Sequence, residues 1–303
     1  MSYSVQNIRN VCLLGHGGNG KTSLAESMLY LTGGTVRLGN PVDGNTVCDY
    51  DPEETRRQIS ISTAVAPIEY NGCKINVLDT PGYFDFVGEV IEALQVSDAA
   101  IIVCSAKAGM SVGAEKAWKL CEQRKLPRLL YISKTDEDNS DYNATFEALR
   151  ARFGNKIAPL VVPIWDEGKK VTGIIDVLNK RAYEMQDLKR VEIDIPEGKD
   201  AVIEEFNNAL KESVAETSEE FMDKFFGGED FTYAEMIHGL RQGVRELSLF
   251  PVLCGSTVNC MGSLMLLGRH RGPAAQPHGG QLSQGHPPGR RDGALRGPPP
   301  GGL

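Results

Sequence analysis

The stretch that decides the fold reads Gly15-His16-Gly17-Gly18-Asn19-Gly20-Lys21-Thr22, and it fits the pattern G-x-x-x-x-G-K-[ST] of a phosphate-binding P-loop. An apolar run at residues 11–14 precedes it and a helical pattern at residues 23–31 follows it, so the loop joins a buried strand to a helix. Glycine backbone N–H groups and the positive end of a helix both favour phosphate at such a turn. We therefore predict that phosphate is bound by Gly15, His16, Gly17, Gly18, Asn19, Gly20, Lys21, Thr22 and Ser23.

Lys21 and Thr22 carry the side chains that this chemistry needs. A lysine at this position reaches the β- and γ-phosphates, and the hydroxyl beside it binds the Mg²⁺ that accompanies them. The alternative is a glycine-rich turn that matches the pattern by chance, which the strand and helix on either side disfavour.

The composition is that of an ordinary globular protein, with 41% hydrophobic and 24% charged residues among 303, and the length suggests about two domains. No apolar run reaches membrane-spanning length and residues 1–10 lack an apolar signal core, so we expect a cytoplasmic protein without a membrane partner. Seven cysteines without a C-x-x-C pair argue against a disulfide framework and a zinc site. The net charge of −8 argues against a generally basic nucleic-acid binder, although it leaves room for a local basic patch. We expect a monomer with no sequence-specific nucleic-acid partner.

Strand and helix patterns alternate after the P-loop. Strand-like runs occupy residues 8–15, 62–70, 74–79, 99–104 and 129–133, and helical spacing occupies residues 20–32, 87–94, 113–124 and 141–152. Asn71-Gly72 between two apolar alternations is a strong hairpin signal. Residues 33–63 lack periodicity, and a loop of that length is usually functional. The alternation predicts an α/β fold of the P-loop NTPase class with a mostly parallel, doubly wound sheet.

The strand at residues 74–79 ends in Asp79-Thr80-Pro81-Gly82. A carboxylate at this strand end can act on the same Mg²⁺ through water, and Gly82 can bring its backbone N–H close to a γ-phosphate. The alternative is an ordinary Asp-x-Pro-Gly turn, which the position after a P-loop and an apolar strand disfavours.

A second strand runs into Ser133-Lys134-Thr135-Asp136. A carboxylate at Asp136 can accept two hydrogen bonds from guanine, one from the ring N–H and one from the exocyclic amine, which adenine cannot supply. We therefore predict base recognition by Ser133, Lys134 and Asp136, with backbone N–H groups of Ser256 and Thr257 closing on the guanine carbonyl. In isolation, residues 133–136 would be a helix cap or exposed turn, and residues 255–257 only a turn.

Residues 158–249 break the alternation. Short strand patterns at 160–162 and 171–177 precede one long helical pattern at 201–226, a further helix at 232–246 and a buried strand at 249–254. We predict a nucleotide-binding domain over residues 1–157 and 250–267 and an inserted α+β subdomain over residues 158–249. The acidic side chains of the long helix are expected to form a solvated face, with a partner-binding surface as the alternative.

In order and spacing, these elements resemble the GTP-binding domain of translational GTPases, specifically elongation factor G and its paralogues. The resemblance is carried by residues 15–22, 57–61, 79–86 and 134–136, by the insertion, and by residues 254–256. Asp194-Ile195-Pro196 ahead of a long acidic helix is similar to the extra subdomain of elongation factor G and not to smaller GTPases. The resemblance implies GTP, GDP and Mg²⁺ as ligands, a switch driven by loss of the γ-phosphate, and the ribosome as partner. It also implies metal ligands at Thr22, Ser60 and Asp79.

Several positions depart from the family pattern. Tyr83 stands where the family usually has a histidine that orients the attacking water, and Gly18 stands where it usually has an aspartate. Ser133 replaces an asparagine that would brace the P-loop more fully, because serine is shorter. The switch segment has Gln58 and Ser60 in place of glycine and threonine, so its Mg²⁺-binding hydroxyl survives. The residues expected to bind GTP and Mg²⁺ are thus mostly retained, whereas the residue expected to orient the attacking water is changed.

We therefore expect a GTPase of the elongation factor G type, coupled to ribosome function in translation, with catalytic roles for Lys21, Gly82 and Tyr83. Hydrolysis is expected to be slow because a phenol positions water differently from an imidazole. The alternatives are a GTP-binding switch with little or no hydrolysis, a non-functional truncated product, and, more distantly, an ATPase, because Ser133 weakens the base motif.

The composition changes at Gly268. Gly, Pro, Arg and Gln dominate residues 268–303, where five Arg and one Asp give +4 and leave −12 for residues 1–267. One interpretation is a disordered basic tail, which suits contact with RNA. We favour a changed reading frame near codon 268. Permitted codons for residues 268–278, when read one base later, encode Asp-Ala-Ile-Val-Gly-Leu-Leu-Pro-Ser-Pro. This peptide is similar to the helix that the family has at this place. The last helix would then be cut after residue 267, leaving an apolar face that favours aggregation and a chain unable to complete a ribosomal cycle.

Overall fold

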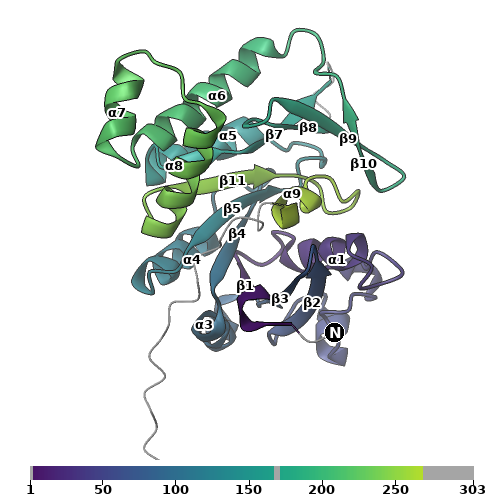
Figure 1. Ribbon diagram of the computed structural model, residues 1–303. Coiled ribbons are helices and arrows are strands. Elements are labelled where there is room, and N and C mark those ends of the chain that lie inside the picture. The colour runs from purple at the N-terminus through teal and green to yellow at the C-terminus, as the bar shows by residue number, and fades with distance from the viewer. Residues whose placement is uncertain (1–2, 167–170, 269–303) are drawn as a thin grey trace, which may run out of the picture.

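The computed structural model describes residues 3–166 and 171–268 of the chain. Its centre is a seven-stranded sheet with the strand order β2-β3-β1-β4-β5-β11-β6 (Figure 1). β2 runs antiparallel to β3, and every other neighbouring pair in this sheet is parallel, so the predicted mostly parallel α/β sheet is confirmed. The strands are β1 (Ile8–Leu14), β2 (Ala64–Tyr70), β3 (Cys73–Asp79), β4 (Ala99–Ser105), β5 (Arg128–Ser133), β6 (Ile157–Pro159) and β11 (Phe250–Cys254).

Helices cover both faces of this sheet. α1 packs against β2 and β3 and contacts α9, whereas α3 packs against β1 and α4 against β1 and β4 (Figure 1). Within the described residues, no helix combines the length and the apolar character that crossing a bilayer requires. These helices are α1 (Lys21–Leu31), α2 (Pro52–Arg57), α3 (Val87–Val96), α4 (Val112–Gln123), α5 (Tyr142–Phe153) and α9 (Ser263–Gly268), with 3-10 turns at Val5–Asn7, Pro41–Asp43 and Phe84–Phe86.

Short local signals determine where several of these elements begin and turn. Asn71 and Gly72 have φ angles of +51° and +79°, the left-handed pair that a two-residue hairpin turn requires, so the predicted hairpin between β2 and β3 is confirmed. Ser111 and Asp141 cap α4 and α5, because each side chain accepts a hydrogen bond from a backbone N–H in the first turn of its helix.

The insertion forms a second lobe beside the β6 edge of the main sheet (Figure 1). Its described residues form an antiparallel sheet with the order β10-β9-β8-β7 and three helices. Its elements are β7 (Val161–Trp165), β8 (Val171–Asp176), β9 (Arg181–Gln186), β10 (Lys189–Ile193), α6 (Asp200–Ala215), α7 (Glu219–Phe226) and α8 (Tyr233–Glu246).

The insertion differs from the sequence-based expectation in three places. The prediction of one helix over residues 201–226 is wrong, because the chain leaves the helix after α6 and Ser218 caps a separate α7. The hairpin of β9 and β10 was not predicted. Residues 157–159 pair with β11 as an edge strand of the main sheet, so the insertion proper begins after that strand.

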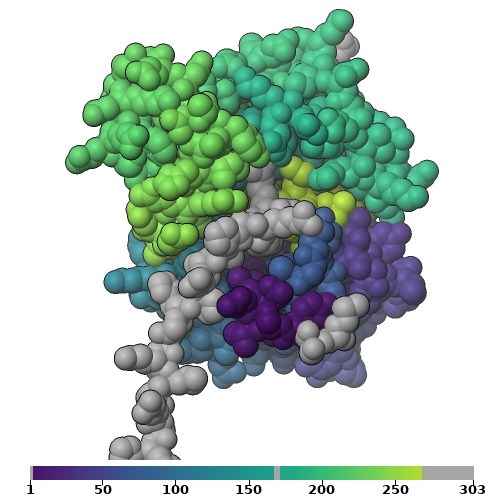
Figure 2. All heavy atoms as spheres, in the orientation of Figure 1, coloured from purple at the N-terminus to yellow at the C-terminus, as the bar shows by residue number. Residues whose placement is uncertain are grey.

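The last described helix, α9, lies between the insertion and α1. Ser263 Oγ is 2.8 Å from Ser27 Oγ of α1, and Arg190 of β10 contacts the sulfur of Met265 at 3.0 Å. Figure 2 shows the yellow C-terminal segment at the junction of the green insertion and the blue and purple N-terminal half. The predicted tail and the predicted change of reading frame lie outside the described residues from residue 269 onward.

Candidate functional site

The P-loop joins β1 to α1 and depends on glycine at two places. Gly15 has φ +139°, and a Cβ there would lie 2.4 Å from the carbonyl oxygen of Val103 in β4. Gly20 directly precedes α1 with φ +87°, in the left-handed region that favours glycine. Asn19 fixes the loop from inside, because its Nδ2 donates to the Val103 carbonyl at 2.9 Å. The turn that a phosphate cradle needs is therefore built into the backbone.

Gly18 and Ser23 are two further residues of the predicted cradle. Gly18 is exposed with φ +79°, and a Cβ there would meet no atom within 4 Å. Ser23 lies half-buried in the first turn of α1. The space at Gly18 would admit the aspartate that the family usually has, at the cost of a left-handed backbone, which aspartate tolerates better than most residues.

Lys21 occupies the interior of the P-loop. Its Nζ donates to the carbonyl oxygens of Gly15 at 3.2 Å and His16 at 3.0 Å, and the residue is 6% exposed. Burial lowers the pKa of Lys21 to about 8, and the nearby carboxylates of Asp79 and Asp49 oppose that shift. An ammonium that donates to loop carbonyls at the start of a helix is placed to exchange them for phosphate oxygens.

The three predicted metal ligands, Thr22, Ser60 and Asp79, lie together. Thr22 Oγ1 donates to Asp79 Oδ2 at 2.7 Å and is 3.2 Å from Ser60 Oγ. Asp79 is 1% exposed, and its Oδ1 is buried without a hydrogen-bond partner among the described residues. Burial raises the pKa of Asp79 to about 7, whereas the hydrogen bond from Thr22 and the charge of Lys21 oppose the shift.

This oxygen cluster fits a Mg²⁺ ion. Ser60 Oγ donates to Asp49 Oδ1 at 2.8 Å, while Thr22 donates to Asp79, so each hydroxyl proton points to a carboxylate. The lone pairs of the two hydroxyl oxygens are therefore left for a cation, and Mg²⁺ prefers such hard oxygen ligands. Asp49, which is only 9% exposed, was not predicted. It lies in the loop without periodicity, where its only sequence signal is its charge.

Two buried glutamates fold residues 33–63 over the oxygen cluster. Glu26 of α1 accepts hydrogen bonds from the backbone N–H groups of residues 47 and 48 at 2.6 and 3.2 Å, and burial raises the pKa of its carboxyl group. Glu54 of α2 accepts from the N–H groups of residues 61 and 62 at 2.8 and 3.0 Å. Sequence reasoning missed both positions, because each glutamate acts on backbone that is distant in the chain or that has no regular structure.

The Gly82-Tyr83 segment lies directly on the P-loop. The Gly82 carbonyl oxygen accepts a hydrogen bond from the Gly17 N–H at 3.1 Å, and a Cβ on Gly82 would lie 2.4 Å from Lys21 Nζ. The Tyr83 ring contacts Gly17 and has its centroid 6.4 Å from that of His16. The residues predicted for catalysis, Lys21, Gly82 and Tyr83, are therefore neighbours. The hydrogen bond between Gly82 and the loop is made through the Gly82 carbonyl.

Ser133 at the end of β5 contacts the P-loop in spite of its short side chain. Its Oγ lies 2.7 Å from the carbonyl oxygen of Asn19 and 3.0 Å from that of Cys104, and its single proton serves one of them at a time. The expected weaker brace is thus one buried hydroxyl that joins β5 to the P-loop.

The other residues predicted for base recognition follow at two strand ends. Lys134 has φ +58° and pairs at 3.0 Å with the glutamate three residues further on. Asp136 is half-buried, and its carboxylate has no hydrogen bond or ion pair to another described residue. The Ser256 N–H already donates to the Met261 carbonyl at 3.1 Å, which leaves the N–H of Thr257 as the candidate of that pair for a base.

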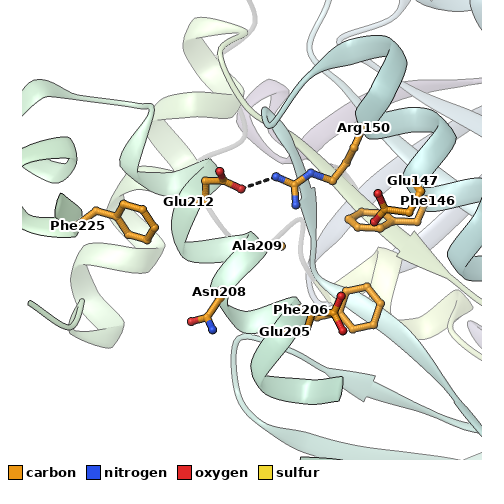
Figure 3. Close-up of a pocket in the computed structure, with 9 residues that line it drawn as sticks. All are labelled: Phe146, Glu147, Arg150, Glu205, Phe206, Asn208, Ala209, Glu212 and Phe225. Atoms are coloured by element: carbon orange, nitrogen blue, oxygen red, sulfur yellow. Dashed lines mark hydrogen bonds and ion pairs between the residues drawn. The ribbon is translucent and has the colours of Figure 1, made fainter. Parts of the chain in front are cut away.

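A cavity of about 240 Å³ lies apart from the P-loop, between α5, α6 and α7 (Figure 3). Phe146, Phe206 and Phe225 contribute apolar walls, while Arg150 reaches across to pair with Glu212 (Figure 3). None of the residues predicted for phosphate, metal or base binding lines this cavity, so we assign it no part in the nucleotide site.

Several known proteins are similar to this chain in sequence or in structure. The family profile described as "Elongation factor Tu GTP binding domain" matches residues 6–269. Elongation factor G-like proteins from Mycobacterium tuberculosis (strain H37Rv) and Thermotoga maritima are 38% and 34% identical over 264 and 263 residues. These matches cover 86% and 87% of the chain but only 36% and 37% of the relatives, so the chain spans little more than a third of their length. A crystal structure of a protein from Thermus thermophilus is similar with a TM-score of 0.82 and 37% identity, covering 90% of the chain and 40% of that protein.

Proposed function

The chain belongs to the family of the elongation factor Tu GTP binding domain, and on that premise we propose that it binds GTP and GDP with Mg²⁺ and hydrolyses GTP to GDP and phosphate. The observation that carries the proposal is the meeting of Lys21, Thr22 and Asp79 at the start of α1. A cation for phosphate and an oxygen cluster for metal stand there side by side, which is the arrangement that phosphoryl transfer uses.

Each group at the site has a role in binding. The loop N–H groups and Lys21 would hold the phosphates, and the hydroxyls of Thr22 and Ser60 would ligate Mg²⁺ with Asp79 behind them. When bound, the metal would neutralise charge on the phosphate oxygens. An incoming phosphate favours the charged ammonium, so nucleotide binding should raise the pKa of Lys21 from its value of about 8.

Guanine preference is proposed from Asp136, whose carboxylate is free to accept the two N–H groups of guanine. The test is competition against a fluorescent GDP analogue in the presence of Mg²⁺. GTP and GDP should displace the analogue at far lower concentration than ATP, because adenine offers no matching pair of donors. ATP that competes as well as GTP would assign the site to an ATPase instead.

Hydrolysis is proposed to be slow, because Tyr83 occupies the place of the usual histidine. We expect Tyr83→His to raise the single-turnover rate of GTP hydrolysis at saturating GTP, with Tyr83→Phe as the control that keeps the ring and removes the hydroxyl. A wild-type chain as fast as the histidine variant contradicts this role. Tyr83 also favours a second candidate function, a GTP-binding switch, which stoichiometric retention of GTP without phosphate release would select.

The partner and the place of action are proposed from the relatives, whose description is elongation factor G-like. We propose a cytoplasmic monomer whose GTP hydrolysis is coupled to ribosome function in translation. Adding purified ribosomes to a single-turnover assay should accelerate phosphate release if the chain carries this coupling by itself. No acceleration, with intact GTP binding, would restrict the chain to nucleotide binding.

A further inference from the structure

Gly17 is the one P-loop glycine whose backbone does not explain it. Gly15, Gly18 and Gly20 have φ angles between +79° and +139°, but Gly17 lies outside the left-handed region. Alanine could therefore adopt the backbone conformation of residue 17 without strain. The reason for glycine at this position must lie in the space around it.

That space is filled by the Tyr83 ring. A Cβ built on Gly17 would meet three atoms of this ring, Cε2, Cζ and Cδ2, at 2.8, 3.0 and 3.1 Å. They are the three nearest heavy atoms to that position. Real Cβ atoms do not approach a neighbour within 3.0 Å, so any side chain at residue 17 would have to displace the ring. Gly17 thus provides the surface on which Tyr83 packs.

The contact places the ring beside the predicted γ-phosphate position. The Gly17 N–H donates to the Gly82 carbonyl at 3.1 Å, and the backbone of Gly82 approaches Lys21 Nζ. Tyr83 is 42% exposed, so its ring packs on the P-loop from one side and has solvent on the other. A side chain at residue 17 should therefore push the Tyr83 ring outward and pull the attached Gly82 carbonyl away from the residue 17 N–H.

We propose that Gly17 is a positioning residue for Tyr83: the absence of a side chain at residue 17 seats the phenol ring on the P-loop, and this seat holds the Gly82-Tyr83 segment at the phosphate site. The inference rests on the proposed function where it concerns hydrolysis, but the seat itself exists without nucleotide. It also implies that the effect of having tyrosine instead of histidine at residue 83 depends on glycine at residue 17.

The first experiment is a double-mutant cycle on the nucleotide-free protein, with Gly17→Ala, Tyr83→Ala and the double variant. The readout is hydrogen–deuterium exchange of the residue 17 N–H, which the Gly82 carbonyl protects. Gly17→Ala should speed this exchange by up to about fivefold, the low end of the cost of overpacking, because the ring can yield toward solvent. The double variant should exchange no faster than Tyr83→Ala alone. Additive effects, or no effect of Gly17→Ala, would overturn the proposal.

Two other glycines provide matched controls. Gly88, in α3, has open space at its Cβ position and no left-handed backbone, so Gly88→Ala should leave the exchange unchanged. A Cβ built on Gly113 would lie 2.7 Å from His16 Cα and 2.8 Å from His16 N, a clash with backbone that no change at Tyr83 can relieve. Any effect of Gly113→Ala should therefore be the same with tyrosine or alanine at residue 83. If Gly113→Ala couples to Tyr83 as strongly as Gly17→Ala does, the seat is not specific and the proposal fails.

The second experiment repeats the cycle on the rate of single-turnover hydrolysis at saturating GTP, with affinity for a fluorescent GDP analogue measured in parallel. Gly17→Ala should change the hydrolysis rate in the Tyr83 background and change it no further when residue 83 is alanine, because the glycine acts through the ring. Equal effects in both backgrounds would show that residue 17 acts on the phosphates directly, against the proposal. Loss of nucleotide binding by the wild-type chain would refute the proposed function and leave the exchange cycle as the test of the seat.

Discussion

Replacing Glu54 by alanine should release the loop that carries Ser60 from the rest of the domain. The Glu54 carboxylate is 1% exposed and accepts the N–H groups of Ile61 at 2.8 Å, Ser62 at 3.0 Å and Asp51 at 3.1 Å. Hydrogen bonds to a charged group contribute about 1.5–3 kcal/mol each. The N–H of Asp51 can bond to water instead, so we count only the hydrogen bonds from residues 61 and 62, which are half-buried. At the low end of that range, the loss of these two bonds should lower the free energy of unfolding by about 3 kcal/mol.

The neighbouring Glu53 provides the control. Its carboxylate is half-exposed and pairs only with Arg56 and Arg57 on the surface of α2, at 2.6 and 3.0 Å. Water screens surface ion pairs, so Glu53→Ala should leave the midpoint of urea unfolding close to that of the wild-type chain. Tryptic cleavage after Arg56 and Arg57 should accelerate in Glu54→Ala, because the loop is no longer tied down. Equal losses of stability in the two variants would refute the assignment of Glu54 as the anchor of this loop.

Two further predictions concern the buried groups of the site. Burial raises the pKa of Asp79 from 3.8 to about 7, so the native state keeps this proton at pH values where the unfolded chain has lost it. Without Mg²⁺ and nucleotide, the free energy of unfolding should therefore fall by up to about 4 kcal/mol as the pH rises from 3.8 to about 7. Urea titrations of Asp79→Asn should lack this pH dependence. Ser133→Ala removes the buried hydroxyl between β5 and the Asn19 carbonyl. The lost hydrogen bond, at about 1–2 kcal/mol, should weaken nucleotide binding roughly fivefold to thirtyfold. An unchanged affinity in equilibrium titration would show that the Ser133 hydroxyl does not support the P-loop.

The parts of the site that were predictable are those written as contiguous residues. The P-loop, the Asp79 turn and the Ser133 turn each combine a strand end with the side chains that act there, so their chemistry can be inferred from spacing alone. Asp49 and Glu26 lack such a context. Asp49 becomes part of the oxygen cluster only through its hydrogen bond to Ser60, and Glu26 acts on backbone about twenty residues away in the chain. Contacts of this kind are set by the tertiary fold rather than by local pattern.

The errors in the insertion also have local causes. The turn between β9 and β10 consists of Asp187 and Leu188 with φ angles of +48° and +60°, so the chain adopts a left-handed hairpin turn without the glycine or asparagine that usually signals it. The break between α6 and α7 has neither glycine nor proline, and the apolar spacing continues across it. Only Ser218, a good helix-capping residue, marks the new start.

The position of β11 in the main sheet has a consequence for the order in which the protein acquires its structure. β11 lies between β5 and β6, yet residues 160–249 separate it from β6 in the chain. While the chain is being made, β5 and β6 therefore keep facing edges without a partner until the whole insertion has been added, and unpaired edges of this kind readily associate with other chains. The strand pairing that completes the sheet also spans a long stretch of sequence, which slows folding. The turns after β5 and β11 that are proposed to read the base should thus be the last parts of the site to become ordered.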